Sequence, residues 1–485
     1  MRLKAKTPGD TRDREGGFSL AENEGFTQSL DNAPLGLFHL RAVVISGTGF
    51  FTDAYDLFII GAAMVLIKQE WAPSKFLVGL VGSSALLAAF LGATVFGRLA
   101  DAVGRKRIYG LEAVIMALGA LLSAFAPNLW WLLIFRFIMG IGIGGDYPVS
   151  AVLMSEYANI KDRGKLVALV FSMQALGLVA GPVVALTLMA SGIPNDIAWR
   201  IMLGLGAIPA LAVIYLRRRM PESPRYVAQV RGQTDEAARN WEAFSGQKVA
   251  APEQAPMHQK VGLKELLSRR STLRLLLGTA GSWFLFDYAY YGNSISMPLV
   301  LKGVEPHTST LTTMAWSLII FAVFAAPGYV LAFARIDQVG HKRLQIIGFV
   351  MMALSFFVIG IWHGIASHVA LFIIIFGISY FFAEFGPNTT TFVIPAEVYP
   401  VSIRTTGHGI SAGVAKLGAF IGVFLFPLMS STFGIAGTLL ITAVFSILGA
   451  LVTLVLPEPS GRSLEELSHD LGRRLVPAGG HRPTR

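Results

Sequence analysis

One carboxylate lies in the middle of a long apolar segment of this 485-residue chain. Asp287 stands within residues 275–301, four residues after Trp283 and four before Tyr291. The segment is long enough to cross a lipid bilayer, where an ionisable side chain is costly and usually serves a function. In a helix, a spacing of four places the three side chains on one stripe, so two aromatic donors flank one acid. This stripe predicts a site for a small polar ligand, and an interfacial tryptophan beside a structural tyrosine is the alternative.

Other polar residues fall in apolar segments of both halves of the chain. Asp53 and Asp56 are three residues apart in one segment, and Asp146 lies in Gly-Gly-Asp-Tyr-Pro. We predict that these three acids and Asp287 take up and release protons, because burial favours the neutral form of a carboxyl until it meets water. Helix–helix hydrogen bonding is the alternative for the three first-half acids. Lys416 either neutralises an acid or contacts an anion. The remaining hydrogen-bonding candidates are Tyr147, Gln174, Glu384 and Asn388.

The composition requires apolar surface that faces lipid. Hydrophobic residues make up 53% of the chain and charged residues 14%, whereas roughly a quarter charged residues is usual in soluble proteins. The net charge is +10, but the basic residues lie along short polar segments between apolar ones, which argues against nucleic-acid binding. Without cysteine, a nucleophile–base pair, a metal-ligand cluster or a G-x-x-x-x-G-K-[ST] loop, we predict no metal, no cofactor and no enzyme.

Apolar segments of bilayer length predict an all-α membrane protein with twelve transmembrane helices. They are residues 41–67, 77–98, 108–126, 129–154, 166–190, 198–216, 273–301, 312–334, 344–363, 367–395, 405–430 and 434–456. Arg and Lys concentrate after the second, fourth, sixth and eighth segments. The positive-inside rule therefore places both termini and the long central loop in the cytoplasm. We expect a multi-pass protein of the plasma (inner) membrane, whose first forty residues lack a signal-peptide pattern.

The two halves of the chain repeat each other. Asp101-Ala-Val-Gly-Arg-Lys-Arg107 recurs as Asp337-Gln-Val-Gly-His-Lys-Arg343, each after the second apolar segment of its half. Duplicated six-helix halves are typical of major-facilitator-type transporters, in which two bundles rock around a site near the membrane midplane. The predicted parts are an N-terminal tail (1–40), a six-helix bundle (41–216), a cytoplasmic loop (217–272), a second six-helix bundle (273–456) and a C-terminal tail (457–485).

Charged residues in the repeated loops are predicted to hold one side of the protein closed. Asp101 and Arg105 lie one helical turn apart, where a carboxylate can pair with nearby guanidinium groups. Pairs that form in one state and separate in the other bias a two-state equilibrium. The predicted gating residues are Asp101, Arg105, Glu156, Arg163, Asp337, Glu397 and Arg404. The alternative is that they are ordinary positive-inside charges on solvated loops.

Several segments together resemble the phosphate:proton symporter family of the major facilitator superfamily. The matching text includes Gly-Phe-Phe-Thr-Asp-Ala-Tyr-Asp-Leu-Phe at 49–58, Gly-Gly-Asp-Tyr-Pro-Val-Ser-Ala at 144–151 and Phe-Gly-Pro-Asn-Thr-Thr-Thr-Phe at 385–392. The resemblance extends over most of the membrane region, and the second and third segments are its more specific parts. One departure is Glu384, where the family more often has an amide, so this chain carries an extra titratable group.

The resemblance implies a phosphate site at the membrane midplane. Its ligands would be Tyr147, Gln174, Trp283, Asp287, Tyr291 and Asn388, with Lys416 added, and Asp53 and Asp146 would belong to the proton path. Phenol, indole and amide groups donate to phosphate oxygens, and Asp287 can sit beside the anion only when protonated. The expected function is import of inorganic phosphate with protons by alternating access, by a monomer in the bilayer. A symporter of an organic acid or sugar, a transporter-like phosphate sensor and coupling to sodium remain as alternatives.

Overall fold

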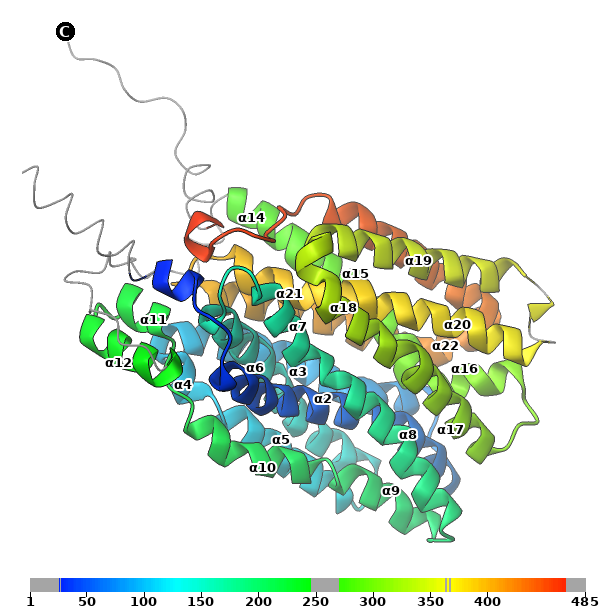
Figure 1. The fold of residues 1–485 in the computed structure, drawn as a ribbon. Coiled ribbons are helices and arrows are strands. Elements are labelled where there is room, and N and C mark those ends of the chain that lie inside the picture. Colours follow the sequence, from blue (N-terminus) through cyan, green and yellow to red (C-terminus); the bar gives the residue numbers. More distant parts are fainter. Residues whose placement is uncertain (1–25, 27, 246–269, 363, 366–367, 468–485) are drawn as a thin grey trace, which may run out of the picture.

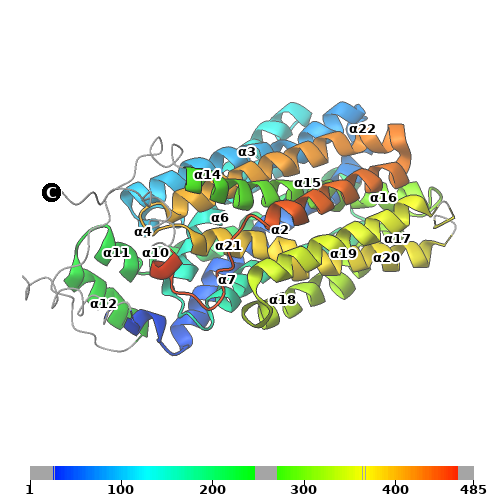
Figure 2. The same cartoon turned by 90° about the horizontal axis from the view of Figure 1, so that it is seen from above.

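The computed structural model describes residues 26, 28–245, 270–362, 364–365 and 368–467. These residues form helices and connecting loops, and no strand occurs among them. The long helices lie side by side along one axis of the molecule (Figure 1), and the view from above shows the same arrangement (Figure 2). This architecture confirms the predicted all-α class.

The first half contributes six helical segments that are long and apolar enough to cross a membrane. They are α2 (Leu37–Trp71), α3 (Lys75–Val103), α4 with α5 (Arg105–Ile108 and Leu111–Ala124), α6 (Leu129–Tyr157), α7 with α8 (Arg163–Ser172 and Gln174–Ala190), and α9 with α10 (Asn195–Gly204 and Ala207–Arg218). Each overlaps one predicted segment and ends within a few residues of it.

The second half is interrupted more often. Its helices are α14 (Arg270–Leu276), η1 (Leu277–Gly281), α15 (Ser282–Ile295), α16 (Met297–Val304), α17 (Thr310–Ile319), η2 (Ile320–Ala325), α18 (Ala326–Val339), α19 (His341–Ile361), α20 (Val369–Ala383), η4 (Glu384–Asn388), α21 (Thr389–Val398) and α22 (Arg404–Thr453). Length and apolarity alone give ten candidate spans in the described residues, against twelve predicted.

The difference in count has two local causes. The predicted span 273–301 is present as α14, η1 and α15, which are continuous from Arg270 to Ile295, and Ser296 separates them from α16. It is not among the ten because Asp287, Asn293 and several tyrosines make it less apolar than the others. The predicted spans 405–430 and 434–456 are continuous as α22, with Gly434 at φ 68° and ψ 177° between them. Glycine adopts that conformation at little cost, so the chain turns back there, and Figure 2 shows the two parts of α22 side by side.

The ends of the molecule differ in what they carry. Two loop helices, α11 (Pro224–Gln229) and α12 (Thr234–Ser245), lie at one end beside α4, and α16 lies at the other (Figure 1). We call these the α11 end and the α16 end. Arg217, which the sequence analysis placed at the start of the central loop, belongs to α10 and is fully buried. Residues 246–269 of that loop lie outside the described residues.

Helices α3 and α22 bring the two halves into close contact. A β-carbon on Gly97 of α3 would lie 2.6 Å from the Thr405 carbonyl oxygen. A β-carbon on Gly409 of α22 would likewise collide with the Ala93 carbonyl oxygen. Small residues at such crossings let two backbones approach closely inside a membrane.

Candidate functional site

Lys416 lies at the centre of a buried polar cluster that both halves contribute to. Its Nζ donates hydrogen bonds to Asp287 Oδ2 at 2.9 Å and to the Tyr291 hydroxyl at 3.0 Å. The same ammonium lies 4.3 Å from the centre of the Tyr291 ring and 4.5 Å from that of the Tyr147 ring. All four side chains are buried. The carboxylate and the two ring faces together compensate a charge that has lost its water.

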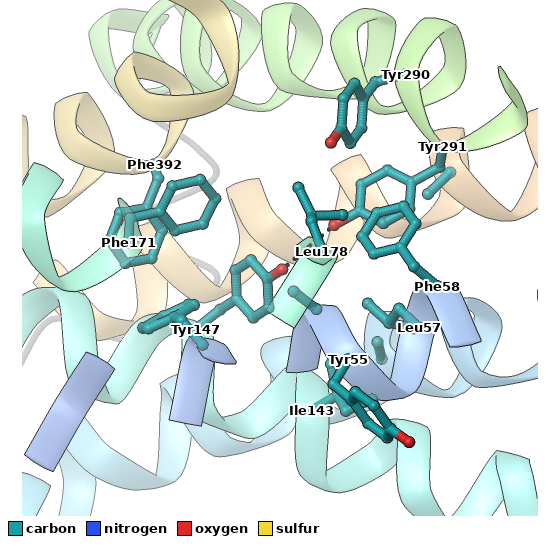
Figure 3. Packing of buried hydrophobic residues seen from close by; sticks show 14 of the residues in the cluster. Tyr55, Leu57, Phe58, Ile143, Tyr147, Phe171, Leu178, Tyr290, Tyr291 and Phe392 are labelled. Atoms are coloured by element: carbon teal, nitrogen blue, oxygen red, sulfur yellow. Dashed lines mark hydrogen bonds between the residues drawn. The ribbon is translucent and has the colours of Figure 1, made fainter. Parts of the chain in front are cut away.

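Hydrogen bonds continue from this cluster through both halves. The hydroxyls of Tyr291 and Tyr147 are 3.3 Å apart and point toward each other (Figure 3). Gln174 Nε2 donates to the Tyr147 hydroxyl at 3.1 Å, and Gln174 Oε1 accepts from the Tyr329 hydroxyl at 3.0 Å. Asn388 Nδ2 then donates to Tyr329 at 2.7 Å. One continuous chain of polar side chains therefore links α6 and α8 with α15, α18, η4 and α22.

Aromatic rings enclose the cluster on one side. The Trp283 ring lies 6.1 Å from that of Tyr147 and 5.5 Å from that of His408. Phe171 and Phe392 stack with ring centres 4.3 Å apart, one from each half (Figure 3). All seven predicted ligands thus lie in or against a single cluster, in surroundings that exclude water and strengthen its electrostatic interactions.

Two residues of this cluster escaped the sequence analysis or were given no role there. Tyr329 connects Gln174 with Asn388, but a lone tyrosine in an apolar segment is usually an interfacial or packing residue. Glu384 was noted only as an extra acid, and it accepts a hydrogen bond from Asn388 Nδ2. Glu384 is the first residue of η4 and Tyr329 contacts its last residue, Asn388. In η4, Pro387 cannot donate a backbone hydrogen bond and the helix widens to a π-turn.

Asp146 does not join the cluster around Lys416, although its neighbour Tyr147 does. Its carboxylate pairs with Arg217 at 2.8 Å and accepts a hydrogen bond from Ser150 at 2.5 Å. Arg217 also pairs with Glu112 at 2.9 Å. A β-carbon on Gly49 would collide with both Asp146 and Arg217, so glycine leaves the room for this pair. The sequence did not predict this pair, because Arg217 was assigned to the cytoplasmic loop and not to a membrane helix.

The remaining two acids also differ from each other. Both carboxyl oxygens of Asp53 are buried and accept no hydrogen bond from any residue that the structure describes. The Arg136 guanidinium donates to the backbone carbonyl of Asp56 at 3.4 Å. The Asp56 carboxylate lies against Gly206, where a β-carbon would collide with it. The three first-half acids therefore lie in three distinct environments, although two of them are a single helical turn apart.

The predicted gating residues form two clusters at the α11 end. In the first, Arg105 pairs with Asp101 and Glu156 at 3.1 Å each and donates to the Val401 carbonyl at 2.8 Å. Glu156 also pairs with Arg404 at 3.1 Å. Since Val401 and Arg404 belong to the second half, this cluster joins the halves.

The second cluster repeats the first with the halves exchanged. Glu397 pairs with Arg163 at 3.2 Å and with His341 at 3.3 Å. His341 lies 3.3 Å from Asp337, which also accepts from the Lys165 amide at 2.7 Å. His341 stands in the repeated loop where the first half has Arg105, so the repeat itself could have indicated it. All seven predicted gating residues take part in these two clusters.

The family follows from comparison with known proteins. A family model described as "Sugar (and other) transporter" matches residues 41–471. The chain belongs to this family of major facilitator transporters. It is therefore a multi-pass integral membrane protein, and its family consists of transporters and not of enzymes.

Its relatives include phosphate transporters. The probable inorganic phosphate transporter 1-6 of Arabidopsis thaliana is 36% identical, with 92% of this chain and 96% of the relative aligned. The inorganic phosphate transporter 1-11 of Oryza sativa subsp. japonica is 35% identical over 95% of this chain and 92% of its own length. These matches confirm the resemblance that the motifs indicated.

Solved structures support the fold. The proton:xylose symporter XylE, bound to 6-bromo-6-deoxy-D-glucose, aligns with a TM-score of 0.75 over 89% of this chain and 98% of that chain. Its sequence identity of 23% limits this comparison to architecture. The described helices thus form the major facilitator fold of two six-helix halves, as predicted.

Proposed function

We propose that this chain imports inorganic phosphate together with protons by alternating access. The observation that carries the proposal is the buried bond from Lys416 to Asp287, set among phenol, amide and indole donors. The similarity to inorganic phosphate transporters supports the substrate. The positive-inside pattern of the loops supports a cytoplasmic position for the α11 end and for both termini.

Phosphate and Asp287 would compete for Lys416. While Asp287 is ionised it occupies the ammonium and would repel an arriving anion. A proton on Asp287 removes that competition and converts the carboxyl into a donor for a phosphate oxygen. Proton uptake therefore favours phosphate binding, and by reciprocity bound phosphate favours proton uptake. Tyr147, Gln174, Tyr291, Asn388 and Trp283 would complete the donor set.

The first-half acids would divide the remaining roles. A buried carboxylate without a partner is costly, so Asp53 would carry a proton in this state and release it when water enters. Asp56 and Asp146 would complete the proton path, and Asp146 lies in contact with Arg217. The clusters around Glu156 and Glu397 would keep the cytoplasmic side closed until the loaded carrier rocks.

The rival substrate is a sugar or an organic acid, since the family description and the solved neighbour both concern sugars. A neutral sugar gives Lys416 no counter-charge when Asp287 becomes protonated, and a buried unpaired ammonium is strongly unfavourable. An anion supplies that charge. The pair thus favours an anionic substrate.

Uptake of labelled phosphate into proteoliposomes with an imposed inward proton gradient tests the proposal. The wild type, Asp287→Asn and the exposed control Asp196→Asn are compared in sodium-free and sodium-containing buffer. We expect gradient-driven uptake that the first variant loses and the control keeps. Uptake that ignores the proton gradient, follows sodium, or is abolished by excess glucose or lactate contradicts the proposal.

A further inference from the structure

A cavity of about 300 Å³ lies between the two halves at the α16 end. Residues of α2 and α3 line it from the first half, and residues of α15, α16 and α22 line it from the second. Its walls are mostly apolar. Two lysines, Lys68 and Lys302, line it together with Gln69 and Ser296, and none of the described residues that line it is acidic.

The two lysines occupy corresponding places in the repeat. Lys68 lies in the last turn of α2, and Lys302 lies in the last turn of α16. Each therefore ends the first membrane segment of its half. The simpler explanation for a lysine at a helix C-terminus is that its charge interacts favourably with the helix dipole. Two that line the same cavity also repel each other, and an anion between them removes that repulsion.

The cavity lies next to the cluster around Lys416. Gly61 and Ile295 line the cavity, and about one helical turn deeper lie Phe58 and Tyr291. The rings of Phe58 and Tyr291 stack with centres 5.5 Å apart and planes at 16°, and Figure 3 shows them facing each other. Tyr291 is also a hydrogen-bond partner of Lys416. One aromatic pair therefore separates the cavity from the proposed phosphate site.

We propose that this cavity is a second, weaker binding site for inorganic phosphate, where Lys68 and Lys302 hold the anion before it passes Phe58 and Tyr291. The proposal rests on the proposed function, which places the α16 end outside the cell. The apolar walls offer few further donors, so the anion is attracted by charge and released readily. Such a cavity raises the local phosphate concentration, which affects the capture of substrate more than its translocation.

Transport kinetics provide the first test. Phosphate uptake is measured at low and high ionic strength for the wild type and Lys68→Gln/Lys302→Gln. Lys75→Gln is the matched control, because Lys75 is exposed at the same end but does not line the cavity. We expect the double variant to raise KM about three- to tenfold at low ionic strength with an unchanged maximal rate, and the difference to vanish in high salt. An unchanged KM, or an equal rise in the control, overturns the proposal.

Direct occupancy provides the second test, which does not depend on transport. An amine-acylating reagent is applied to the purified protein in phosphate or in chloride at equal ionic strength, and labelling of each lysine is read by peptide mass spectrometry. We expect phosphate to slow labelling of Lys68 and Lys302 but not of Lys75, and to do so in Asp287→Asn as well. Equal protection by chloride overturns the second phosphate site, whereas protection in a protein that transports no phosphate overturns only the proposed function.

Discussion

Two buried acid–base pairs of nearly equal length lie in surroundings that differ. Arg217 contacts Asp146 at 2.8 Å and a second acid, Glu112, and all three residues belong to the first half. Lys416 contacts Asp287 at 2.9 Å and otherwise touches phenols of both halves. A proton on Asp146 or Glu112 still leaves Arg217 one carboxylate, so we call this the fixed pair. A proton on Asp287 removes the one carboxylate that the described residues give Lys416, so we call that the exchangeable pair. The pair of Arg217 and Asp146 therefore suits a structural role within the first bundle. The pair of Lys416 and Asp287 suits a role in which the lysine exchanges its carboxylate for another anion.

The ends of the molecule show a related contrast. At the α11 end, opposite charges such as Arg105 and Glu156 join the halves in two buried clusters. At the α16 end, like charges on Lys68 and Lys302 face one cavity. The first arrangement favours closure at that end. The second opposes closure unless an anion is present.

Removing the fixed arginine gives the largest expected effect. Arg217→Gln leaves Asp146 and Glu112 buried without a cation, which we expect to cost about 3–5 kcal/mol of folding stability. Thermal unfolding in detergent measures it, with the exposed Arg218→Gln as the control. Equal melting temperatures for the two variants would remove the distinction between a fixed and an exchangeable pair.

Removing the exchangeable lysine affects transport more than folding. In Lys416→Gln, Asp287 can take up a proton and so avoid an uncompensated charge, but the anion loses its cation. We expect phosphate uptake (kcat/KM) to fall by roughly a hundredfold, about 2–3 kcal/mol, with a smaller loss of stability than in Arg217→Gln. Lys416→Arg is the charge-preserving comparison and should retain part of the uptake. If Lys416→Gln transports normally, the pair has no role in binding phosphate.

The hydroxyl that joins the halves gives a smaller effect. Tyr291→Phe removes the bonds to Lys416 and Tyr147 and keeps the ring that stacks on Phe58. We expect a loss of about 1 kcal/mol, seen as a KM for phosphate raised roughly fivefold with little change in melting temperature. Tyr288→Phe is the control, because that hydroxyl donates only weakly, to the Met429 sulfur at 3.5 Å. A rise in KM of the same size in both variants contradicts a specific role for Tyr291.

A third pair, Arg225 with Glu465, lies outside the membrane segments and gives the smallest effect. The Glu465 side chain is partly exposed, and water weakens an ion pair. Burial opposes the charge of Glu465, but the Arg225 guanidinium at 2.6 Å outweighs it and lowers the pKa of that carboxyl to about 2. We expect Glu465→Gln to cost about 1 kcal/mol at pH 7.

The pH dependence of this pair has a defined sign. Because the folded pKa lies below the ordinary value of 4.5, the stabilisation is complete above pH 4.5 and disappears as the pH falls through about 2. Melting temperatures at pH 7 and pH 3 measure it. Glu466→Gln is the control, since Glu466 is exposed and pairs with Arg462. A variant effect that grows as the pH falls would reverse the expected sign.

Much of the site could be found from particular residues in the sequence. Asp287 stands out because a carboxyl in an apolar segment is costly, and Trp283 and Tyr291 follow from helical spacing. Tyr329 could not be found, because one tyrosine among many aromatic residues carries no such cost. The span 273–301 was predicted, but its break at Ser296 was not, since hydropathy reports apolarity and not backbone geometry.

Sequence by itself determined the membrane class, the twelve apolar segments, the repeat of two halves and the residues that could bind an anion or a proton. These features depend on residue type and spacing along the chain, which hydropathy and helical periodicity report directly. Only the tertiary structure decided which acid meets which base: Asp146 with Arg217, Asp287 with Lys416, and Asp53 with no described residue. Such pairing depends on how helices far apart in sequence are rotated and packed, and Coulomb energies in a low-dielectric interior change steeply over a few ångströms.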